Sequence, residues 1–387
     1  VSSNNILAKS FGILCSRKQI EFEWQHISPI KKSSSIIKNI YHLFPLIFKA
    51  IFSLILYLIQ HWPLRGIGLN NWQSTEAEVS FFSYFFNLDP KSAKLGNYKS
   101  QFWGNLPEEL LKDDIPTNWC HIYVKDRFIS TPRKAAALIK QFNKISNAKQ
   151  NHITIDTFLG WKIIVKTFLD WFRLLKRAKK LKRLSSIKKE SYDYLLPFFK
   201  NDLDESIYGP TALSNLLYFN LLKKAISLLP KQKKGIYLQE NQSWEFALIQ
   251  IWKGSQNNDI IGVPHSSVRF WDLRYFFDKN FYNKEKSKDE NLPLPNKVAV
   301  IGKLMHKMYI EGGYRKSDLI NVEALRYLYL NKININNSLV NGKKTLLVLG
   351  DYLFDDTDHQ IRILESAFSS LSNNIKLLIK THPNCPI

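Results

Sequence analysis

A cation, a hydroxyl, an imidazole and a proline occupy the four consecutive positions 380–383 (KTHP), directly after the apolar run 375–379. These polar groups suit hydrogen bonds to a phosphate or a ribose, and the proline ring fixes the local backbone. A second apolar run, 345–349, ends in Gly350 and Asp351. The sequence therefore predicts a polar binding site where these two runs end.

Two further apolar runs are followed at once by ionisable side chains. Glu240 follows the run 235–239, and His265 follows the run 259–263. In open parallel sheets, ligands bind outside the carboxyl ends of the strands, so polar side chains at such ends are candidates for a site. The other candidates beyond these two runs are Glu245, Ser266, Arg269 and Asp272.

Each candidate also has a purely structural interpretation. Glu240 is typical of the first turn of a helix, and Asn241 is typical of an N-cap. His265 is equally consistent with a loop histidine that hydrogen-bonds to the backbone. Asp351 is consistent with a cap of the helix predicted at 357–371, although three later aspartates lie nearer to that helix.

The elements that must position these residues alternate between strands and helices. Further strands are predicted at 79–87, 118–124 and 297–301. Other helices are predicted at 132–145, 153–190, 244–252 and 322–330. Because several strands are apolar on both faces, we expect an α/β fold with a parallel sheet covered by helices. A polar stretch at 280–296 predicts two domains, 1–290 and 297–387.

The charge of the chain limits the classes of partner. Its 387 residues include 55 basic and 33 acidic side chains, a formal net charge of +22. Such a charge attracts nucleic acid, an anionic membrane surface or phosphorylated substrates. No nucleic-acid reader motif accompanies the charge, so we expect no nucleic-acid partner. An apolar fraction of 45% excludes a largely disordered protein.

Familiar metal and cofactor motifs do not occur in the sequence. Three cysteines without a CxxC spacing exclude a disulfide framework and a Cys-rich zinc site. There is no GxxxxGK[ST] phosphate loop, no GxGxxG, no GxSxG and no HExxH. We therefore expect no metal and no cofactor.

Two helical segments are candidates for contact with a membrane. The apolar segment 43–60 is marginal in length for a bilayer span, which needs about 20 residues. It is consistent with a spanning, a buried or a membrane-docked helix. The segment 173–189 surrounds a thin apolar stripe with Lys and Arg, which fits a solvated face, a helix docked on an anionic leaflet or a nucleic-acid contact. That stripe consists of Leu174, Ala178, Leu181 and Leu184.

Several short segments resemble bacterial surface-carbohydrate proteins of O-antigen or capsule biosynthesis, a family of GT-B type glycosyltransferases. The segments are 62–68 (WPLRGIG), 85–90 (FFNLDP), 118–126 (NWCHIYVKD), 237–245 (YLQENQSWE), 262–265 (GVPH), 322–328 (VEALRYL) and 380–383 (KTHP). The resemblance is strongest at 237–245 with His265, and at 380–383. In related bacterial sialyl- and KDO-transferases a His-Pro pair contacts the CMP part of the donor, which corresponds to His382 and Pro383 here.

This resemblance implies a metal-independent glycosyltransferase with two Rossmann-like domains and a nucleotide sugar, possibly CMP-linked, as its donor. Transfer without a metal needs polar groups that stabilise the leaving phosphate and a base for the acceptor hydroxyl. We expect Glu240 or His265 to be that catalytic base. The implied donor-binding residues are Gly350, Asp351, Lys380, Thr381, His382 and Pro383. The implied acceptor-side residues are Glu245, Ser266, Arg269 and Asp272.

A growing polysaccharide carried on a lipid would account for both the apolar segment 43–60 and the basic segment 173–189. The enzyme would then be peripheral on the cytoplasmic face of the cell membrane. The alternative is a non-catalytic, membrane-associated scaffold of the same fold. It would use its basic faces to bind a membrane or a partner, and nucleotide-sugar binding would separate it from the enzyme.

The sequence opens without Met and closes just after a predicted strand, so we expect a fragment whose C-terminal domain is truncated. The enzyme hypothesis depends on one geometric expectation. Glu240, His265, Asp351 and His382, far apart in the sequence, should converge on a single crevice.

Overall fold

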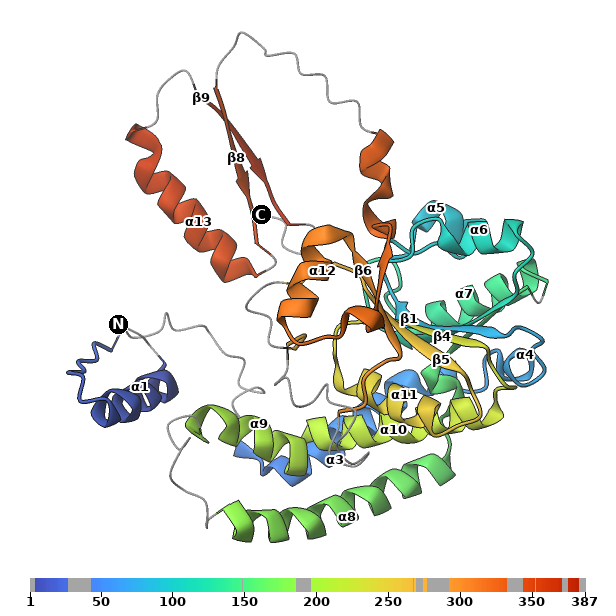
Figure 1. Ribbon diagram of the computed structural model, residues 1–387, viewed down its shortest axis with the longest axis horizontal. Helices are drawn as coiled ribbons and strands as arrows, with labels where there is room; N and C mark the ends of the chain where they lie inside the picture. The colour runs from blue at the N-terminus through green and yellow to red at the C-terminus, as the bar shows by residue number, and fades with distance from the viewer. Residues whose placement is uncertain are drawn as a thin grey trace. The chain divides into compact units, whose positions relative to one another are not determined.

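The structure is a computed structural model that describes residues 4–26, 43–147, 149–185, 196–266, 268, 274–276, 292–332, 344–351, 353–370 and 375–382. The chain divides into two compact units, Val1–Leu330 and Asn331–Ile387 (Figure 1). The first unit carries a large sheet with helices on both faces. The second carries two strands and one α-helix in its described part.

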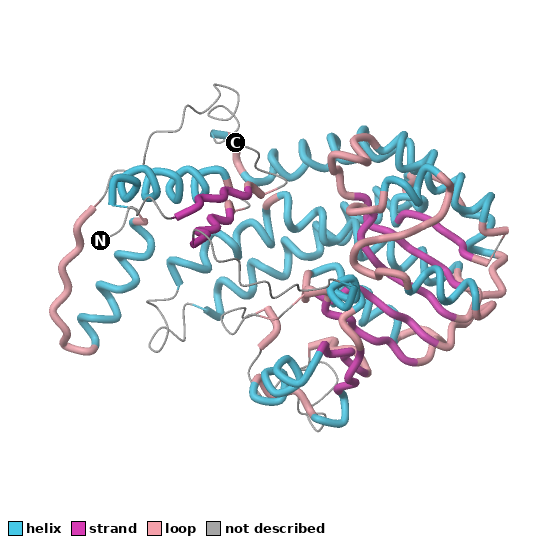
Figure 2. The backbone as a smooth tube through the Cα atoms, turned by 90° about the horizontal axis from the view of Figure 1, so that it is seen from above, coloured by secondary structure: helices cyan, strands magenta, loops and turns pink. Residues whose placement is uncertain are grey.

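Seven parallel strands form the sheet of the first unit, in the order β3-β2-β1-β4-β5-β6-β7 (magenta in Figure 2). The strands are β1 (Val79–Phe85), β2 (Thr117–Tyr123), β3 (Gln150–Thr154), β4 (Lys234–Gln239), β5 (Asp259–Pro264), β6 (Lys297–Ile301) and β7 (Leu319–Val322). The strand order reverses between β1 and β4, as in doubly wound nucleotide-binding folds. The predicted α/β fold with a Rossmann-like parallel sheet is therefore confirmed.

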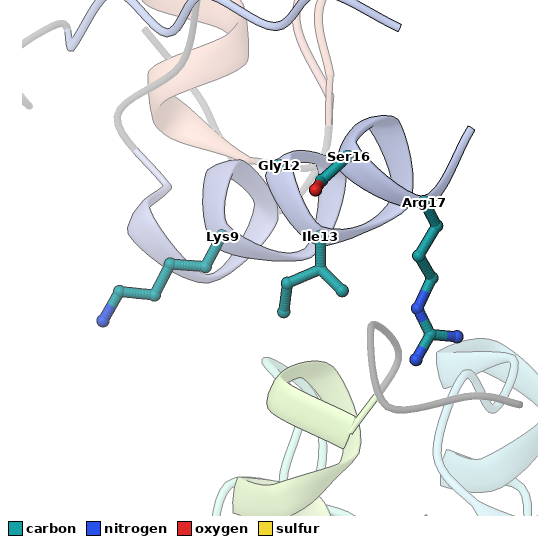
Figure 3. Close-up of a pocket in the computed structure, with 5 residues that line it drawn as sticks. All are labelled: Lys9, Gly12, Ile13, Ser16 and Arg17. Carbon is teal, nitrogen blue, oxygen red and sulfur yellow. The ribbon is translucent and has the colours of Figure 1, made fainter. Parts of the chain in front are cut away.

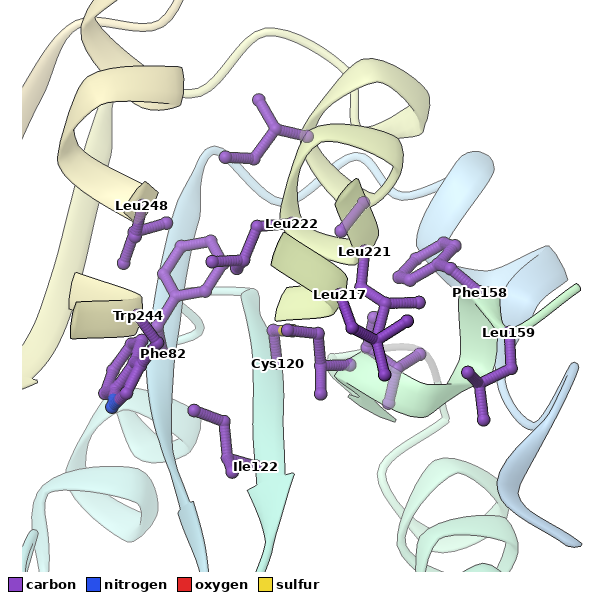
Figure 4. Packing of buried hydrophobic residues seen from close by; sticks show 14 of the residues in the cluster. Phe82, Cys120, Ile122, Phe158, Leu159, Leu217, Leu221, Leu222, Trp244 and Leu248 are labelled. Carbon is purple, nitrogen blue, oxygen red and sulfur yellow. The ribbon is translucent and has the colours of Figure 1, made fainter. Parts of the chain in front are cut away.

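Helices cover both faces of this sheet. The α-helices described in the first unit are α1 (Asn5–Arg17), α3 (Leu46–His61), α4 (Leu69–Gln73), α5 (Pro90–Lys94), α6 (Leu106–Lys112), α7 (Pro132–Ile145), α8 (Trp161–Ser185), α9 (Leu196–Tyr208), α10 (Pro210–Leu228), α11 (Ser243–Lys253) and α12 (Gly302–Glu311). Of these, α8 and α9 pack on α10, and α1 packs on α9, outside the layer that covers the sheet. Successive side chains of a strand point to opposite faces, so β1 contributes to two separate apolar clusters. Phe82 packs with α10 and α11 (Figure 4), whereas Phe81 and Phe85 pack with α7 on the opposite face.

The burial of the central strands explains why they carry apolar and aromatic side chains on both faces, with a few buried polar side chains among them. All seven residues of β2 are buried, and five of the seven residues of β1 are buried. A parallel sheet that is covered on both faces requires such runs, because neither set of alternating side chains reaches water. The same coverage leaves the strand ends as the places where polar side chains meet solvent.

The division between the units differs from the expected boundary at 290. The strand β6 pairs with β5, and β7 pairs with β6, so the segment 297–322 belongs to the large sheet and the first unit extends to Leu330. Pairing between distant strands cannot be read from the local polar stretch at 280–296, most of which lies outside the described residues.

Two predicted helices also differ from the structure. The helix expected from 153 begins only at Trp161, because 150–154 forms β3. The segment 322–330 contains the end of β7 and a 3-10 helix, Leu325–Lys332, instead of an α-helix. The residues 150–154 (QNHIT) carry no apolar periodicity of their own, and 322–330 is a short, largely apolar run, so neither pattern distinguishes a strand from a helix.

The second unit contains β8 (Lys344–Leu349), α13 (Phe354–Ala367) and β9 (Ile375–Lys380). The strands β8 and β9 are parallel, with Leu349 opposite Lys380. The helix α13 connects them, as a parallel crossover requires. The carboxyl ends of the two strands therefore lie side by side, as the sequence predicts for this βαβ segment.

The apolar stripe expected on the basic helix faces the interior. Ala178 is 1% exposed, and Leu174 packs against the cluster formed with α10. The side chains of Leu181 and Leu184 lie outside the described residues, as do residues 186–189. The outer face of α8 carries a different set of apolar residues, because the direction in which a helix packs depends on its neighbours and not on its own charge pattern.

Gly235 offers a test of the packing between β4 and α11. A Cβ atom at Gly235 would lie 2.6 Å from Cζ2 of Trp252, whose side chain is fully buried. We expect Gly235→Ala to lower the free energy of unfolding by about 1–3 kcal/mol through overpacking. Chemical denaturation measures the free energy of unfolding of each variant. Gly160→Ala is the matched control, since a Cβ there meets nothing within 4 Å, and an equal loss in both variants would contradict the prediction.

Candidate functional site

The two predicted catalytic residues lie together at the carboxyl edge of the large sheet. Glu240 follows β4 and His265 follows β5, and these strands are neighbours. Oε1 of Glu240 lies 3.4 Å from Nε2 of His265. The Glu240 side chain is 25% exposed and the His265 side chain 14%. This position is beside the reversal of strand order between β1 and β4, where ligands bind in open α/β sheets.

Glu245 holds the backbone of the Glu240 loop. Its two carboxylate oxygens accept hydrogen bonds from the backbone N–H groups of Glu240, Asn241 and Gln242, at 2.8–3.2 Å. Gln242 and Glu245 together form a capping box at the start of α11. Glu245 is 1% exposed, so its carboxylate faces the loop backbone and not the acceptor side that the sequence suggested.

Burial raises the pKa of Glu245 to about 8, while the three backbone N–H groups act in the opposite direction.

Asn241, in the middle of the held loop, has a φ of 54°, in the left-handed region. Asparagine tolerates that region better than most residues. Its side chain donates to the carbonyl oxygen of Arg274 at 2.6 Å and accepts from Gln239 at 2.9 Å. Asn241 is therefore a structural residue of the loop.

His265 is neutral near neutral pH. Burial is the main cause that lowers its pKa from 6.5 to about 4, and the charges of Arg326 and Arg274 lower it further. Its Nδ1 is buried and has no hydrogen-bond partner among the described residues. The contact of Nε2 with Glu240 is thus the polar contact that orients this imidazole.

Aromatic side chains surround the Glu240–His265 pair. The ring of Phe102 meets the His265 ring edge to face, with centroids 5.0 Å apart, and also contacts Phe86. Tyr84 lies between Phe86 and Trp244, and its hydroxyl accepts a hydrogen bond from Nε1 of Trp244 at 3.1 Å. Burial raises the pKa of Tyr84, and the nearby carboxylates of Glu240 and Glu245 add to this.

Arg326 reaches the same place from the segment after β7. Its guanidinium carbon lies 5.8 Å from the centroid of Phe102. The segment approaches closely because Gly104 has no side chain: a Cβ there would lie 2.7 Å from the carbonyl oxygen of Leu325. Sequence reasoning assigned no role to Phe102, Tyr84 or Arg326. The segments 85–90 and 322–328, which carry the family resemblance, were the signal that pointed to this region.

The other residues predicted beside His265 are only partly described. Ser266 is half-buried directly after His265. Arg269 and Asp272 lie outside the described residues.

The second unit brings most of its predicted donor-binding residues together. Gly350 donates its backbone N–H to the carbonyl oxygen of Lys380 at 2.9 Å. A Cβ at Gly350 would lie 3.3 Å from the backbone of both Thr381 and His382. Asp351 accepts from the backbone N–H of Leu353 at 3.1 Å, in the turn that precedes α13. Pro383 lies outside the described residues.

Glu240 and His265 lie in the first unit, whereas Asp351 and His382 lie in the second. The expectation that all four converge on one crevice therefore stays a prediction. In the described part of the chain, no group of three or more His, Cys, Asp or Glu residues is placed to hold a metal ion.

An open hollow of about 620 Å³ lies along α1 (Figure 3). It is lined by Lys9, Gly12, Ile13, Ser16 and Arg17. A single helix face without a carboxylate or an imidazole lacks an acid–base group, so we do not assign the chemistry to this hollow.

Comparison with protein-family models gave no match to the chain, and comparison with curated proteins gave none either.

The lowered pKa of His265 predicts a pH dependence of stability. Below pH 6.5 the unfolded chain takes up a proton on this residue, whereas the folded protein does so only near pH 4. The free energy of unfolding should therefore fall as the pH decreases from about 6.5 to about 4. Denaturant unfolding at about pH 7 and about pH 5 should show a smaller loss in His265→Gln than in the wild type. His26→Gln, at an exposed histidine, should behave as the wild type, and equal losses in all three proteins would contradict the assignment.

Proposed function

We propose that this protein is a glycosyltransferase that moves a sugar from a nucleotide-sugar donor to a growing surface polysaccharide. The observation that carries the proposal is the Glu240–His265 pair at the carboxyl edge of the sheet, beside the reversal of strand order. The pair combines a partly exposed carboxylate with a neutral imidazole. The segments that resemble surface-carbohydrate glycosyltransferases include both residues.

Glu240 is the general base of the proposed reaction. Its carboxylate takes the proton of the acceptor hydroxyl while the acceptor oxygen bonds to the anomeric carbon of the donor sugar. The bond from that carbon to the phosphate oxygen breaks, and the phosphate leaves with the electron pair. His265 donates its Nε2–H towards Glu240 and orients the carboxylate. Its pKa of about 4 keeps the imidazole neutral during this step.

The surroundings of the pair suit a carbohydrate with a negative charge nearby. The rings of Phe86 and Phe102 offer apolar faces against which a sugar ring packs. The guanidinium of Arg326 lies on the same side as Phe102 and suits a phosphate or carboxylate. This end of the first unit is therefore the proposed acceptor side, with Ser266, Arg269 and Asp272 as further candidates.

The second unit is the proposed start of a nucleotide-sugar domain, which would complete a GT-B type arrangement. Gly350, Thr381 and His382 lie together where β8 and β9 end. Lys380 supplies a cation there, and the N-terminus of α13 follows Asp351, so the segment offers donors to a phosphate without a metal ion. CMP is the nucleotide that the His-Pro resemblance at 382–383 suggests.

Substitution of Glu240 tests the base. Glu240→Gln keeps the shape of the side chain but does not accept the proton, so we expect kcat for sugar transfer to fall about 100-fold or more. The measurement is the mass shift of an oligosaccharide acceptor incubated with candidate nucleotide sugars. Glu323→Gln is the matched control, since Glu323 is an exposed glutamate beyond the end of β7. Full transfer activity in Glu240→Gln would refute the assignment.

Substitution of His382 tests the donor site. His382→Ala removes an imidazole beside Gly350, and we expect CMP to bind about tenfold more weakly in titration calorimetry because a hydrogen bond to a charged group is lost. His359→Ala, at an exposed position of α13 in the same unit, should bind CMP as the wild type does. Equal affinity in all three proteins would remove His382 from the proposed site.

A non-catalytic scaffold in polysaccharide assembly is the second candidate. The large exposed apolar residues of α3, including Phe48, Phe52 and Ile59, favour it, because they suit attachment to a surface without any reaction. The transfer assay separates the two candidates, since a scaffold has no activity for Glu240→Gln to reduce.

A further inference from the structure

The outer face of α3 is apolar over most of its length, up to the exposed Gln60 near its end. Six large side chains of this helix are exposed: Ile47, Phe48, Phe52, Ile55, Leu56 and Ile59. Phe48 is 61% exposed and Ile59 is 68% exposed. Exposed apolar patches of this kind mark sites of protein or membrane contact.

The inner face of α3 is fixed to the first unit. Ala50 and Leu54 are buried in the cluster that includes α10. The hydroxyl of Tyr57 donates to Oδ1 of the buried Asp156 at 2.5 Å, and the Tyr57 ring stacks on that of His61. These contacts hold the helix parallel to the body of the unit, with one side always covered by protein.

One segment of the described residues, Leu46–Leu64, is long and apolar enough to cross a membrane by length and composition. Length therefore does not exclude a spanning helix. The inner face of α3, anchored on the protein along Ala50, Leu54 and Tyr57, favours instead a helix that lies in the plane of a membrane surface.

The outer face of α8 combines apolar and basic side chains. Trp161, Val165, Leu169 and Phe172 are exposed and recur at helical spacing. At about 100° per residue they fall within an arc of about 80°. Seven basic residues accompany them between 161 and 180: Lys162, Lys166, Arg173, Lys176, Arg177, Lys179 and Lys180. The one acidic residue in this range, Asp170, pairs with Lys166 and Arg173.

The outer faces of α3 and α8 meet at a pair of tryptophans. The rings of Trp62 and Trp161 have centroids 6.4 Å apart, and the guanidinium carbon of Arg65 lies 5.0 Å from the Trp62 ring centroid. Both helices pack on α10, on the same side of the sheet (Figure 1). Tryptophan and arginine are typical of the interface between hydrocarbon and lipid headgroups.

We propose that the outer faces of α3 and α8 form one docking surface for an anionic lipid bilayer. The apolar side chains of α3 and of the first half of α8 enter the headgroup region, while the Lys and Arg side chains of α8 contact lipid phosphates. The charge identifies the partner, because seven basic side chains against one acidic side chain leave this face positive, which complements an anionic leaflet and not a neutral apolar protein. This surface rests on the exposed residues alone and not on the proposed transfer reaction.

Vesicle flotation tests the surface without any sugar substrate. The wild type should float with vesicles of phosphatidylcholine mixed with phosphatidylglycerol, and far less with phosphatidylcholine alone. The fourfold variant Lys176→Gln, Arg177→Gln, Lys179→Gln, Lys180→Gln should bind the mixed vesicles at least about tenfold more weakly. The reason is that each basic residue near the surface contributes to the attraction to anionic lipid. Phe52→Ser with Leu169→Ser should weaken binding to a similar degree, and both sites are exposed enough to leave folding intact.

A matched control removes the same charge from the opposite face of the sheet. Lys91→Gln, Lys94→Gln, Lys140→Gln, Lys144→Gln changes exposed lysines of α5 and α7 and should float as the wild type does. An equal loss in this control would overturn the proposal, because net charge and not the surface would then be responsible. Resistance of the bound protein to an alkaline carbonate wash would also overturn it, since that result indicates a spanning helix. Vesicle binding in a protein without transfer activity would support the surface and reject only the enzyme.

Discussion

A single buried carboxylate determines the geometry of the candidate site. Glu245 accepts hydrogen bonds from three consecutive backbone N–H groups, and this clamp fixes the turn between β4 and α11. A carboxylate with 1% exposure is costly to bury, and hydrogen bonds from backbone donors offset only part of that cost, so the pKa of Glu245 stays raised. The turn is thereby kept in a conformation with Asn241 at positive φ and Glu240 at the solvent edge. The position of Glu240 next to His265 depends on this clamp.

The two edges of the sheet use polar residues in different ways. At the amino edge, Thr75, Asn118 and Asn151 hydrogen-bond to one another, and Asn118 also donates to Gln232. These side chains are buried away from water, so they hydrogen-bond to one another in place of water. At the carboxyl edge, Glu240 keeps a quarter of its side chain in solvent. The Glu240–His265 pair lies at the carboxyl edge, which agrees with the general position of sites in parallel sheets.

Exposed apolar residues distinguish the outer helices from the core. Trp171 of α8 points inward and donates to the carbonyl oxygen of Ile207, whereas Phe172, the next residue, is 60% exposed. The same helix therefore stabilises the first unit and presents a surface to its surroundings. In the second unit, Leu347 and Leu349 of β8 and Leu378 of β9 are also exposed. A two-stranded sheet buries little apolar area on its own, so apolar burial contributes less stability to this unit than to the first unit.

The sequence by itself determined most of the alternation of strands and helices, apart from β3 and β7, and the residues that follow the predicted strands, because both are local patterns. Glu240 and His265 could be named in advance, since each directly follows a continuous apolar run. The tertiary structure alone decided the strand order, which pairs β6 with β5 and adds β7 to the large sheet. It also decided that Glu245 turns inward, that Arg326 and Phe102 approach His265, and that Leu174 and Ala178 face α10. These features depend on contacts between residues tens to hundreds of positions apart, and no periodicity or spacing within one segment specifies which distant surface that segment will meet.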